Sequence, residues 1–220
     1  MGVSYNPKTV TDGLILYVDA ANPKSYPGTG LTWSDLSGNG RNLTLSANAS
    51  FTADKGGGLT FITDSNASVS TTFSISSGFT LSVWVKHATL GTAEIQRYIT
   101  IGPDAAGLRK NSTTATRLQT YFLNSTATLR QIELDGQIFI NNYYNFTSTY
   151  DGTVLRLYNN GVQVSSLTTT DIMRTPTGIQ LSAIGESMLG NIYAAKVYNR
   201  ALSVTEIQEN FNALRGRFGL

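Results

Sequence analysis

Two carboxylates, spaced so that both would lie on the same face of a β-strand, are the clearest candidates for catalysis. Glu133 and Asp135 are two positions apart, so on a β-strand both side chains would lie on the same face. A retaining glycosidase needs two such groups about 5 Å apart, one as nucleophile and one as acid. However, Asp135 precedes Gly136, and Asp-Gly is typical of a turn between strands. We therefore predict that the pair is structural and that the chain is not an enzyme.

His87 is the only histidine of the chain, and there is no cysteine. A Ser-His-Asp or Cys-His system would have to use His87, yet no serine carries a nucleophile signature. One histidine without cysteine also argues against a transition-metal site, and disulfides are impossible. We predict that His87 packs at the end of the strand that contains Trp84.

Calcium is the one metal that the composition leaves open, because it needs only carboxylate, amide and backbone oxygens. Asp19, Asn22 and Asp35 lie in expected loops and are the candidate ligands. Their spacing matches no calcium loop, and Asx turns are the simpler explanation. We expect no cofactor and retain calcium at these residues as an alternative.

Aromatic rings beside amide and carboxylate groups are the residues suited to carbohydrate binding. A ring can stack on a sugar face while nearby polar groups hold the hydroxyls. Two places have this combination, and their residues are Tyr26, Trp33, Asp35 and Asn39 in a glycine-rich loop, and Tyr143 and Tyr144 further along. The alternative is that these rings pack inside the fold or lie at a subunit contact. For Trp33 we favour packing, because the tight turn after it needs an anchor.

The composition excludes several classes of protein. Charged residues make up only 14% of the 220 residues, against about 25% in typical soluble domains, and the net charge is +2. No basic patch suggests nucleic acid as a partner. No apolar run approaches the roughly 18 residues of a membrane span, and the polar first residues do not resemble a secretory signal.

Short apolar or alternating runs separated by turn residues predict an all-β fold. The expected strands are residues 13–19, 80–86, 98–101, 118–123, 137–140 and 192–198. A hairpin is expected where residues 154–158 and 162–165 flank Asn160-Gly161, since Asn-Gly favours the positive φ angles of a tight turn. Residues 89–116 are the least regular and should contain long loops.

A single helix is expected at the C-terminus, over residues 203–215. Ser203 and Glu206 have the spacing of a capping box. Leu202 and Ile207 can form a hydrophobic staple across the start, and Gly216 is the expected stop.

Ile207, Phe211 and Leu214 fall on one face of this helix, so it should pack on the sandwich. We expect one domain over residues 1–220, with residues 1–12 as an N-terminal arm. The predicted fold is a two-sheet antiparallel jelly-roll sandwich with one short C-terminal helix.

Three segments resemble the concanavalin A-like lectin/glucanase superfamily, in its laminin G-like branch. Residues 80–86 (TLSVWVK) are similar to its core strand, residues 149–161 to its hairpin, and residues 190–207 to its closing strand and helix. The glucanases of this group carry a second Glu two or three residues after the Asp. Gln137 and Ile138 stand at those positions here, so the acid/base partner is missing. No motif anchors the family's calcium ligands.

Residues 13–28, 33–40 and 210–219 look like proteins encoded by tailed phages. This resemblance implies a non-enzymatic virion protein, made in the host cytoplasm: a capsid decoration protein, or a part of a fibre or tail. Its expected partners are other virion proteins and further copies of itself in a homo-oligomer. The alternative is a carbohydrate-binding adhesin or receptor-binding module for host surface glycans. Fold alone does not choose between these functions.

Overall fold

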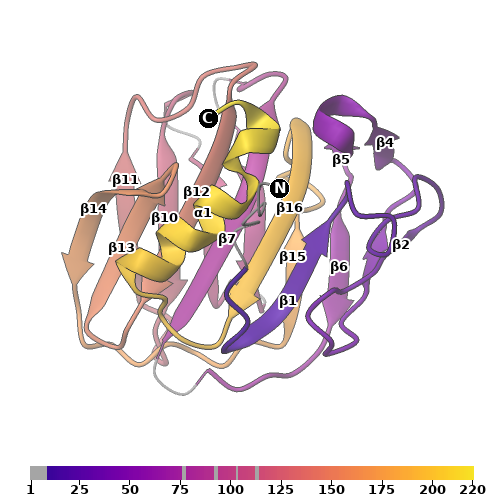
Figure 1. Cartoon of the computed structure of the whole chain (residues 1–220). Helices are drawn as coiled ribbons and strands as arrows, with labels where there is room; N and C mark the ends of the chain where they lie inside the picture. Colours follow the sequence, from indigo (N-terminus) through magenta and orange to yellow (C-terminus); the bar gives the residue numbers. More distant parts are fainter. Residues whose placement is uncertain (1–8, 76–77, 92–93, 103, 112–113) are drawn as a thin grey trace, which may run out of the picture.

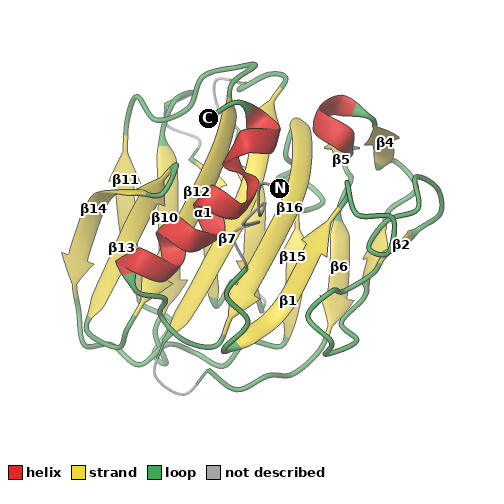
Figure 2. Ribbon diagram, in the orientation of Figure 1, coloured by secondary structure: helices red, strands yellow, loops and turns green. Residues whose placement is uncertain are grey.

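The computed structural model describes residues 9–75, 78–91, 94–102, 104–111 and 114–220. These residues form two stacked antiparallel sheets of eight strands each, which we call sheet A and sheet B. Helix α1 (Val204–Phe218) lies across the front of sheet A, as Figures 1 and 2 show. The predicted sandwich with one C-terminal helix is confirmed. Residues 1–8 of the expected N-terminal arm lie outside the described residues.

Sheet A carries the helix. Its strands in spatial order are β14 (Val162–Thr168), β13 (Val154–Asn159), β12 (Tyr143–Tyr150), β7 (Phe79–His87), β16 (Gly190–Tyr198), β5 (Gly58–Phe61) and β4 (Ser50–Thr52), and β1 (Leu14–Asp19) also pairs with β16. A short 3-10 helix, η1 (Asp54–Gly56), connects β4 to β5.

Sheet B is the rear layer in Figure 1. Its strands in spatial order are β11 (Leu129–Leu134), β10 (Leu118–Leu123), β9 (Ala106–Lys110), β8 (Gln96–Ile101), β15 (Gly178–Leu181), β6 (Ala67–Ser70), β3 (Leu43–Leu45) and β2 (Thr32–Trp33). Its outer face carries no helix among the residues that the structure describes.

Alternation along the strands places one apolar face of each sheet in the core between them. Leu81, Val83 and Val85 of β7 are fully buried and belong to this core, as their spacing predicts. Leu108 of β9 and Phe122 of β10 reach the same core from sheet B.

The hairpin and the start of the helix form as their local chemistry predicts. Asn160 and Gly161 have φ angles of 51° and 76°, and β13 pairs with β14 across them. Ser203 accepts a hydrogen bond from the amide of Glu206, whose carboxylate accepts one from the amide of Ser203. The predicted capping box is therefore present.

The helix is longer than predicted. Gly216 lies inside it, and the last turn ends at Gly219, which has a left-handed φ of 76° and donates its amide hydrogen to Arg215. The reason lies one turn beyond the expected stop. Phe218 is buried and stacks on Trp84 with ring centroids 4.2 Å apart, so packing extends the helix past the glycine.

One strand prediction needs correction, and two strands were not predicted. Residues 137–140 form a loop, because only Ile138 reaches the core while Phe139 and Ile140 are about half exposed. The segment 89–116 contains the regular strand β9 as well as β8. Strand β12 lies near the middle of sheet A and was not predicted, although its Tyr144, Phe146 and Tyr150 alternate with polar residues and reach the core. On its other face, Asn145 and Thr147 hydrogen-bond to Ser82 of the neighbouring strand.

Candidate functional site

A groove crosses the outer face of sheet B. On β15, Ile179 and Leu181 are buried in the core, so Gln180 between them points outward. Two hollows of about 430 and 280 Å³ share Gly102 and Gln180 and form one continuous groove over β6, β15 and β8. Polar side chains therefore line an open channel on the sheet face that no described helix covers.

Arg97 of β8 organises the end of the groove beside the loops that follow β8 and β15. Its guanidinium forms ion pairs with Asp104 and Glu186, which come from two loops on either side of it. It also donates a hydrogen bond of 3.2 Å to the hydroxyl of Tyr121. The side chain of Arg97 is only 16% exposed, so these partners hold it in one orientation.

The rest of the lining combines small, polar and apolar groups. Ser68 of β6 has a cross-strand neighbour in Gln180, and both line the groove. Gly185 brings bare backbone to its wall, where a ligand can approach closely, whereas Gly102 packs against the backbone of Pro176. Ile184 is 66% exposed at the rim and offers an apolar contact.

Beside the groove, the same sheet face is closed by an aromatic ring. Tyr121 lies flat over Gly107, where an added Cβ atom would be 2.9 Å from the ring. The Arg109 guanidinium lies 4.5 Å from the centre of the ring. Burial raises the pKa of Tyr121 to about 12, so the hydroxyl stays protonated. The ring thus supports Arg97 and is not itself an exposed surface for a sugar.

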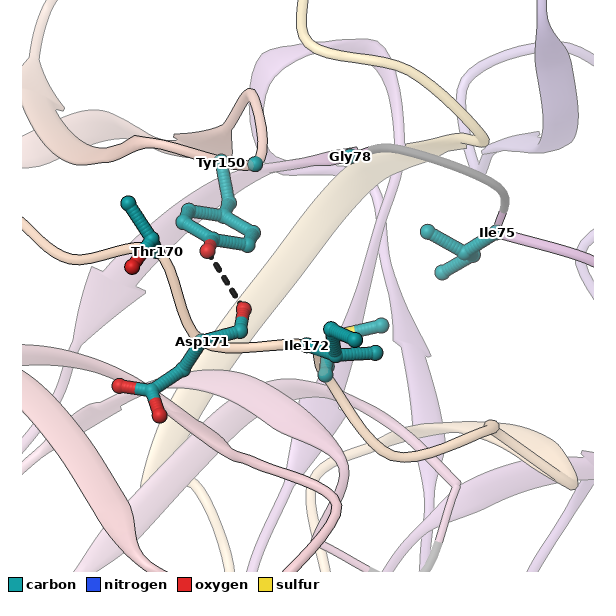
Figure 3. A pocket seen from close by; sticks show the side chains of 8 residues that line it. Ile75, Gly78, Tyr150, Thr170, Asp171 and Ile172 are labelled. Carbon is teal, nitrogen blue, oxygen red and sulfur yellow. Dashed lines mark hydrogen bonds between the residues drawn. The ribbon is translucent and has the colours of Figure 1, made fainter.

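A second, smaller pocket of about 120 Å³ lies at one end of the sandwich (Figure 3). Ile75, Ile172 and Met173 give it an apolar lining. The hydroxyl of Tyr150 donates to the backbone oxygens of Thr169 and Asp171, at 3.1 and 2.6 Å. The hydroxyl of Tyr150 thus already has hydrogen-bond partners, and the pocket suits a small aliphatic group better than a sugar.

The aromatic residues of the glycine-rich loop are buried. Trp33 is 0% exposed and pairs with Leu43 across β2 and β3. Tyr26 is 5% exposed, and its hydroxyl donates to the backbone oxygen of Gly30. Neither ring has a free face on which a sugar could stack, so Trp33 is the packing residue that we favoured.

The polar residues of this loop bind the loop itself. Asp35 accepts hydrogen bonds from the backbone amides of Tyr17, Ser37 and Arg41. Asn39 donates its amide hydrogens to the backbone of residues 14 and 15 on β1. These groups hold the loop against β1.

Tyr143 and Tyr144 are adjacent on β12 and therefore point to opposite faces of sheet A. Tyr144 is buried in the core and stacks on Phe146. Tyr143 lies under the end of α1, where its hydroxyl donates to Asp54 at 2.9 and 3.0 Å. The structure does not bring the two tyrosines together as one binding surface, and glycan contact at either stays a prediction.

The three candidate calcium ligands have protein partners. Asp19 accepts from the amide of Ala21 at 3.0 Å and pairs with Arg217 at 2.7 Å. Asn22 accepts from the amide of Lys24, which is the expected Asx turn, and Asp35 is bonded as above. Across the described ranges no group of three or more His, Cys, Asp or Glu could hold a metal ion. Calcium at this loop stays a prediction.

The two catalytic candidates have structural roles. Arg117 forms ion pairs with both Glu133 and Asp135, at 3.2 and 2.7 Å. His87 is fully buried, as the packing interpretation expects, and its Nε2 atom lies 2.9 Å from the hydroxyl of Tyr98.

Sequence reasoning missed the groove entirely. Arg97 and Glu186 are 89 positions apart, so no local motif could connect them. Alternation over residues 178–181 was the one available signal, because it places the polar Gln180 opposite two core residues.

Comparisons with known proteins bear on the fold. A search of curated proteins finds no match. Among solved structures, the receptor binding domain of botulinum neurotoxin C/D mosaic serotype is similar, with a TM-score of 0.70 and 12% identity over 92% of this chain and 51% of that one.

The binding domain of botulinum neurotoxin DC is similar in two complexes. With rat synaptotagmin II, the TM-score is 0.73 at 13% identity, over 94% of this chain and 52% of that one. With SialylT, it is 0.73 at 14% identity, over 93% and 52%. The chain thus spans about half the length of the solved chains it matches. At these identities the likeness concerns the fold.

The sequence itself matches one family profile, over residues 62–208 of 220. None of the described helices has the length and apolarity that crossing a membrane requires. The matched segment runs from the end of β5 into α1 and includes most of both sheets. The chain belongs to the concanavalin A-like lectin/glucanases superfamily.

Proposed function

We propose that this chain is a non-enzymatic recognition module that binds a carbohydrate in the groove on the outer face of sheet B. The observation that carries the proposal is the fixed guanidinium of Arg97 beside the outward-pointing Gln180 in an open polar channel. Both side chains present planar hydrogen-bonding groups, which suit the hydroxyl pairs of a sugar.

The groove also fits a sugar in shape and polarity. Its two hollows together extend over three strands, which is room for an extended ligand. Backbone at Gly185 is open to close approach, and Ile184 can contact the apolar C–H face of a ring. The solved structures that the chain resembles are binding domains, one of them in complex with a protein receptor, which supports recognition as the general role.

The carboxylates near this face argue against hydrolysis. A glycosidase needs one carboxyl group free to protonate the leaving oxygen and another free to attack or to activate water. Asp104 and Glu186 both bind Arg97, and Glu133 and Asp135 both bind Arg117. The proposal is therefore binding without turnover.

A glycan array followed by titration tests this function. Gln180→Ala removes groove-lining polar atoms without emptying the core, and a lost hydrogen bond should weaken binding of the best glycan by roughly two- to tenfold. Gln163→Ala is the matched control, because Gln163 is exposed on β14 of the other sheet. Absence of any glycan signal, or equal loss in both variants, would reject the groove as the site.

A second candidate function is favoured by the edge of sheet A. Strand β14 is an edge strand of seven residues with no charged residue or proline, whereas natural proteins commonly protect such edges with charge. We infer from this edge, and from the resemblance to tailed-phage proteins, a structural virion component that pairs with other virion proteins or with further copies of itself.

Co-purification separates the second candidate from the first. A virion component should remain with intact phage particles at a fixed copy number. Ser166→Lys places a charge on the β14 edge and should release it, whereas Ser125→Lys places the same charge in an exposed loop and should not. A chain that is monomeric by light scattering and absent from particles would contradict this role.

A further inference from the structure

A lysine and an asparagine are buried together between helix α1 and sheet A. Lys196 of β16 is 4% exposed and Asn210 of α1 is 5% exposed. The Nζ atom of Lys196 lies 3.4 Å from the side-chain oxygen of Asn210. Lysine is almost never buried to this degree unless it is paired.

The usual partner for such a lysine is a carboxylate, and here it is engaged elsewhere. Asp19 is close enough to influence Lys196, but its Oδ1 atom forms an ion pair with Arg217 at 2.7 Å. Among the described residues, Lys196 takes part in no ion pair within 4.0 Å. Its polar contacts are the Thr9 hydroxyl at 3.3 Å and Asn210, with the ring of Tyr17 at 4.8 Å.

These surroundings favour the neutral amine, which is the nucleophilic form of lysine. Burial lowers the pKa of Lys196 to about 8, and Asp19 opposes that shift only in part. Near pH 8, about half of the molecules would therefore hold an uncharged amine beside the amide.

Hydrogen bonds hold the side-chain amide of Asn210 in an orientation that suits an electrophile. Its carbonyl oxygen accepts a hydrogen bond of 3.1 Å from the backbone amide of Val10, a fixed donor that can stabilise negative charge on that oxygen. Its nitrogen lies 3.0 Å from the hydroxyl of Tyr198, which in turn donates to the backbone oxygen of Val10 at 2.9 Å. The amide therefore cannot turn away from the amine without losing its hydrogen bonds with Val10 and Tyr198.

We propose that Lys196 and Asn210 become joined by an isopeptide bond. The Nζ atom attacks the side-chain carbonyl carbon of Asn210, and the new bond between Nζ and that carbon replaces the bond from the carbon to Nδ2. The Nδ2 atom leaves as ammonia and takes one proton from the attacking amine. No oxidant or other reactant is required.

Two hydroxyl groups can pass this proton. The Thr9 hydroxyl lies beside the amine, and the Tyr198 hydroxyl lies beside the departing nitrogen. The buried location excludes bulk water, which favours attack by the amine over hydrolysis of the amide.

The bond would fasten the C-terminal helix to the centre of sheet A. Without it, α1 is attached to β16 through the short connection after Tyr198, through packing and through noncovalent contacts such as the hydrogen bond from Asn210 to Tyr198. The chain has no cysteine, so a disulfide cannot supply this link. The inference does not depend on the proposed function, since a carbohydrate-binding module and a virion component would both gain a helix that cannot detach.

Intact-mass spectrometry of the purified, denatured full chain tests the proposal. The expected mass is that of the sequence less one ammonia. A tryptic digest should contain one branched peptide that links the segment with Lys196 to the segment with Asn210. An unchanged mass, after allowance for removal of the initiator methionine, would overturn the proposal.

The variants exclude the other source of ammonia loss, which is succinimide formation at Asn-Gly steps such as Asn39-Gly40 and Asn160-Gly161. Lys196→Met should restore the full mass, while Lys86→Met, a lysine on the same face of the neighbouring strand β7, should keep the deficit. Asn210→Asp should lose water in place of ammonia if it crosslinks. A deficit that persists in Lys196→Met would overturn the proposal even where the wild-type mass is low.

Discussion

His87 and Tyr98 meet inside the sandwich, where the Nε2 atom of the histidine lies 2.9 Å from the tyrosine hydroxyl. Both side chains are 0% exposed, and their rings make an edge-on contact at 5.4 Å. Burial lowers the pKa of His87 to about 4 and raises the pKa of Tyr98 well above its usual value. The pair is therefore neutral at physiological pH.

This burial predicts a loss of stability in mild acid. The unfolded chain takes up a proton at His87 near pH 6.5, whereas the folded chain does so only near pH 4. The free energy of unfolding should therefore fall between those two values, by up to about 3 kcal/mol in total, and level off below them as far as His87 is concerned. Urea unfolding at about pH 7 and about pH 5 measures the difference. His87→Gln should remove most of it, and an equal pH dependence in the variant would contradict the assignment.

Trp33 should matter for stability and little for binding. Its side chain is fully buried, so Trp33→Ala should lower the free energy of unfolding by roughly 3–5 kcal/mol. Its indole nitrogen has no hydrogen-bond partner among the described residues, so Trp33→Phe should cost much less. Leu31→Ala, at an exposed neighbouring position, is the control and should be nearly silent. A normally stable Trp33→Ala protein that loses a specific glycan would restore the exposed-ring interpretation.

The attachment of the helix depends most on its last turn. Phe218 is 3% exposed and stacks on Trp84, whereas Phe211 is only partly buried. Phe218→Ala should therefore cost roughly 3–5 kcal/mol and Phe211→Ala clearly less. Ser203→Ala removes the cap and should cost about 1 kcal/mol. Thermal melts give this order directly, and a silent Phe218→Ala would mean that the helix is not docked as described.

Local chemistry carried the successful sequence predictions. The capping box at Ser203 and the turn at Asn160-Gly161 depend on neighbours within a few residues, so they could be found without knowing the fold. Strand β12 was not predicted from the sequence. Its outward residues Asn145 and Thr147 are polar, and their partner Ser82 is more than 60 positions away. The alternation of Tyr144, Phe146 and Tyr150 with these polar residues was the local signal for the strand.

The candidate site could not be predicted either, because its residues are far apart in the sequence and meet only in the tertiary structure. The groove joins Arg97 to Glu186, and the buried amine of Lys196 meets Asn210 only because α1 folds back over β16. Conversely, the aromatic loop residues that suggested sugar binding are buried, since composition cannot distinguish an exposed Trp33 from a packed one. Exposure is a property of the tertiary structure, and stacking surfaces depend on it.

The carboxylates of Glu133 on β11 and Asp135 in the turn after it yield the final prediction. Glu133 accepts hydrogen bonds from Asn111 and Gln119 as well as from Arg117, so its oxygens are committed to the sheet face. We expect no turnover of any β-glucan, by reducing-sugar release over a long incubation, and we expect Glu133→Gln to lower the melting temperature slightly because an amide nitrogen would face those donors. Glu209→Gln, an exposed position on α1, is the matched control and should leave melting unchanged. Hydrolysis by the wild type that disappears in Glu133→Gln, while Glu209→Gln stays active, would establish the catalytic role that the ion pairs with Arg117 argue against.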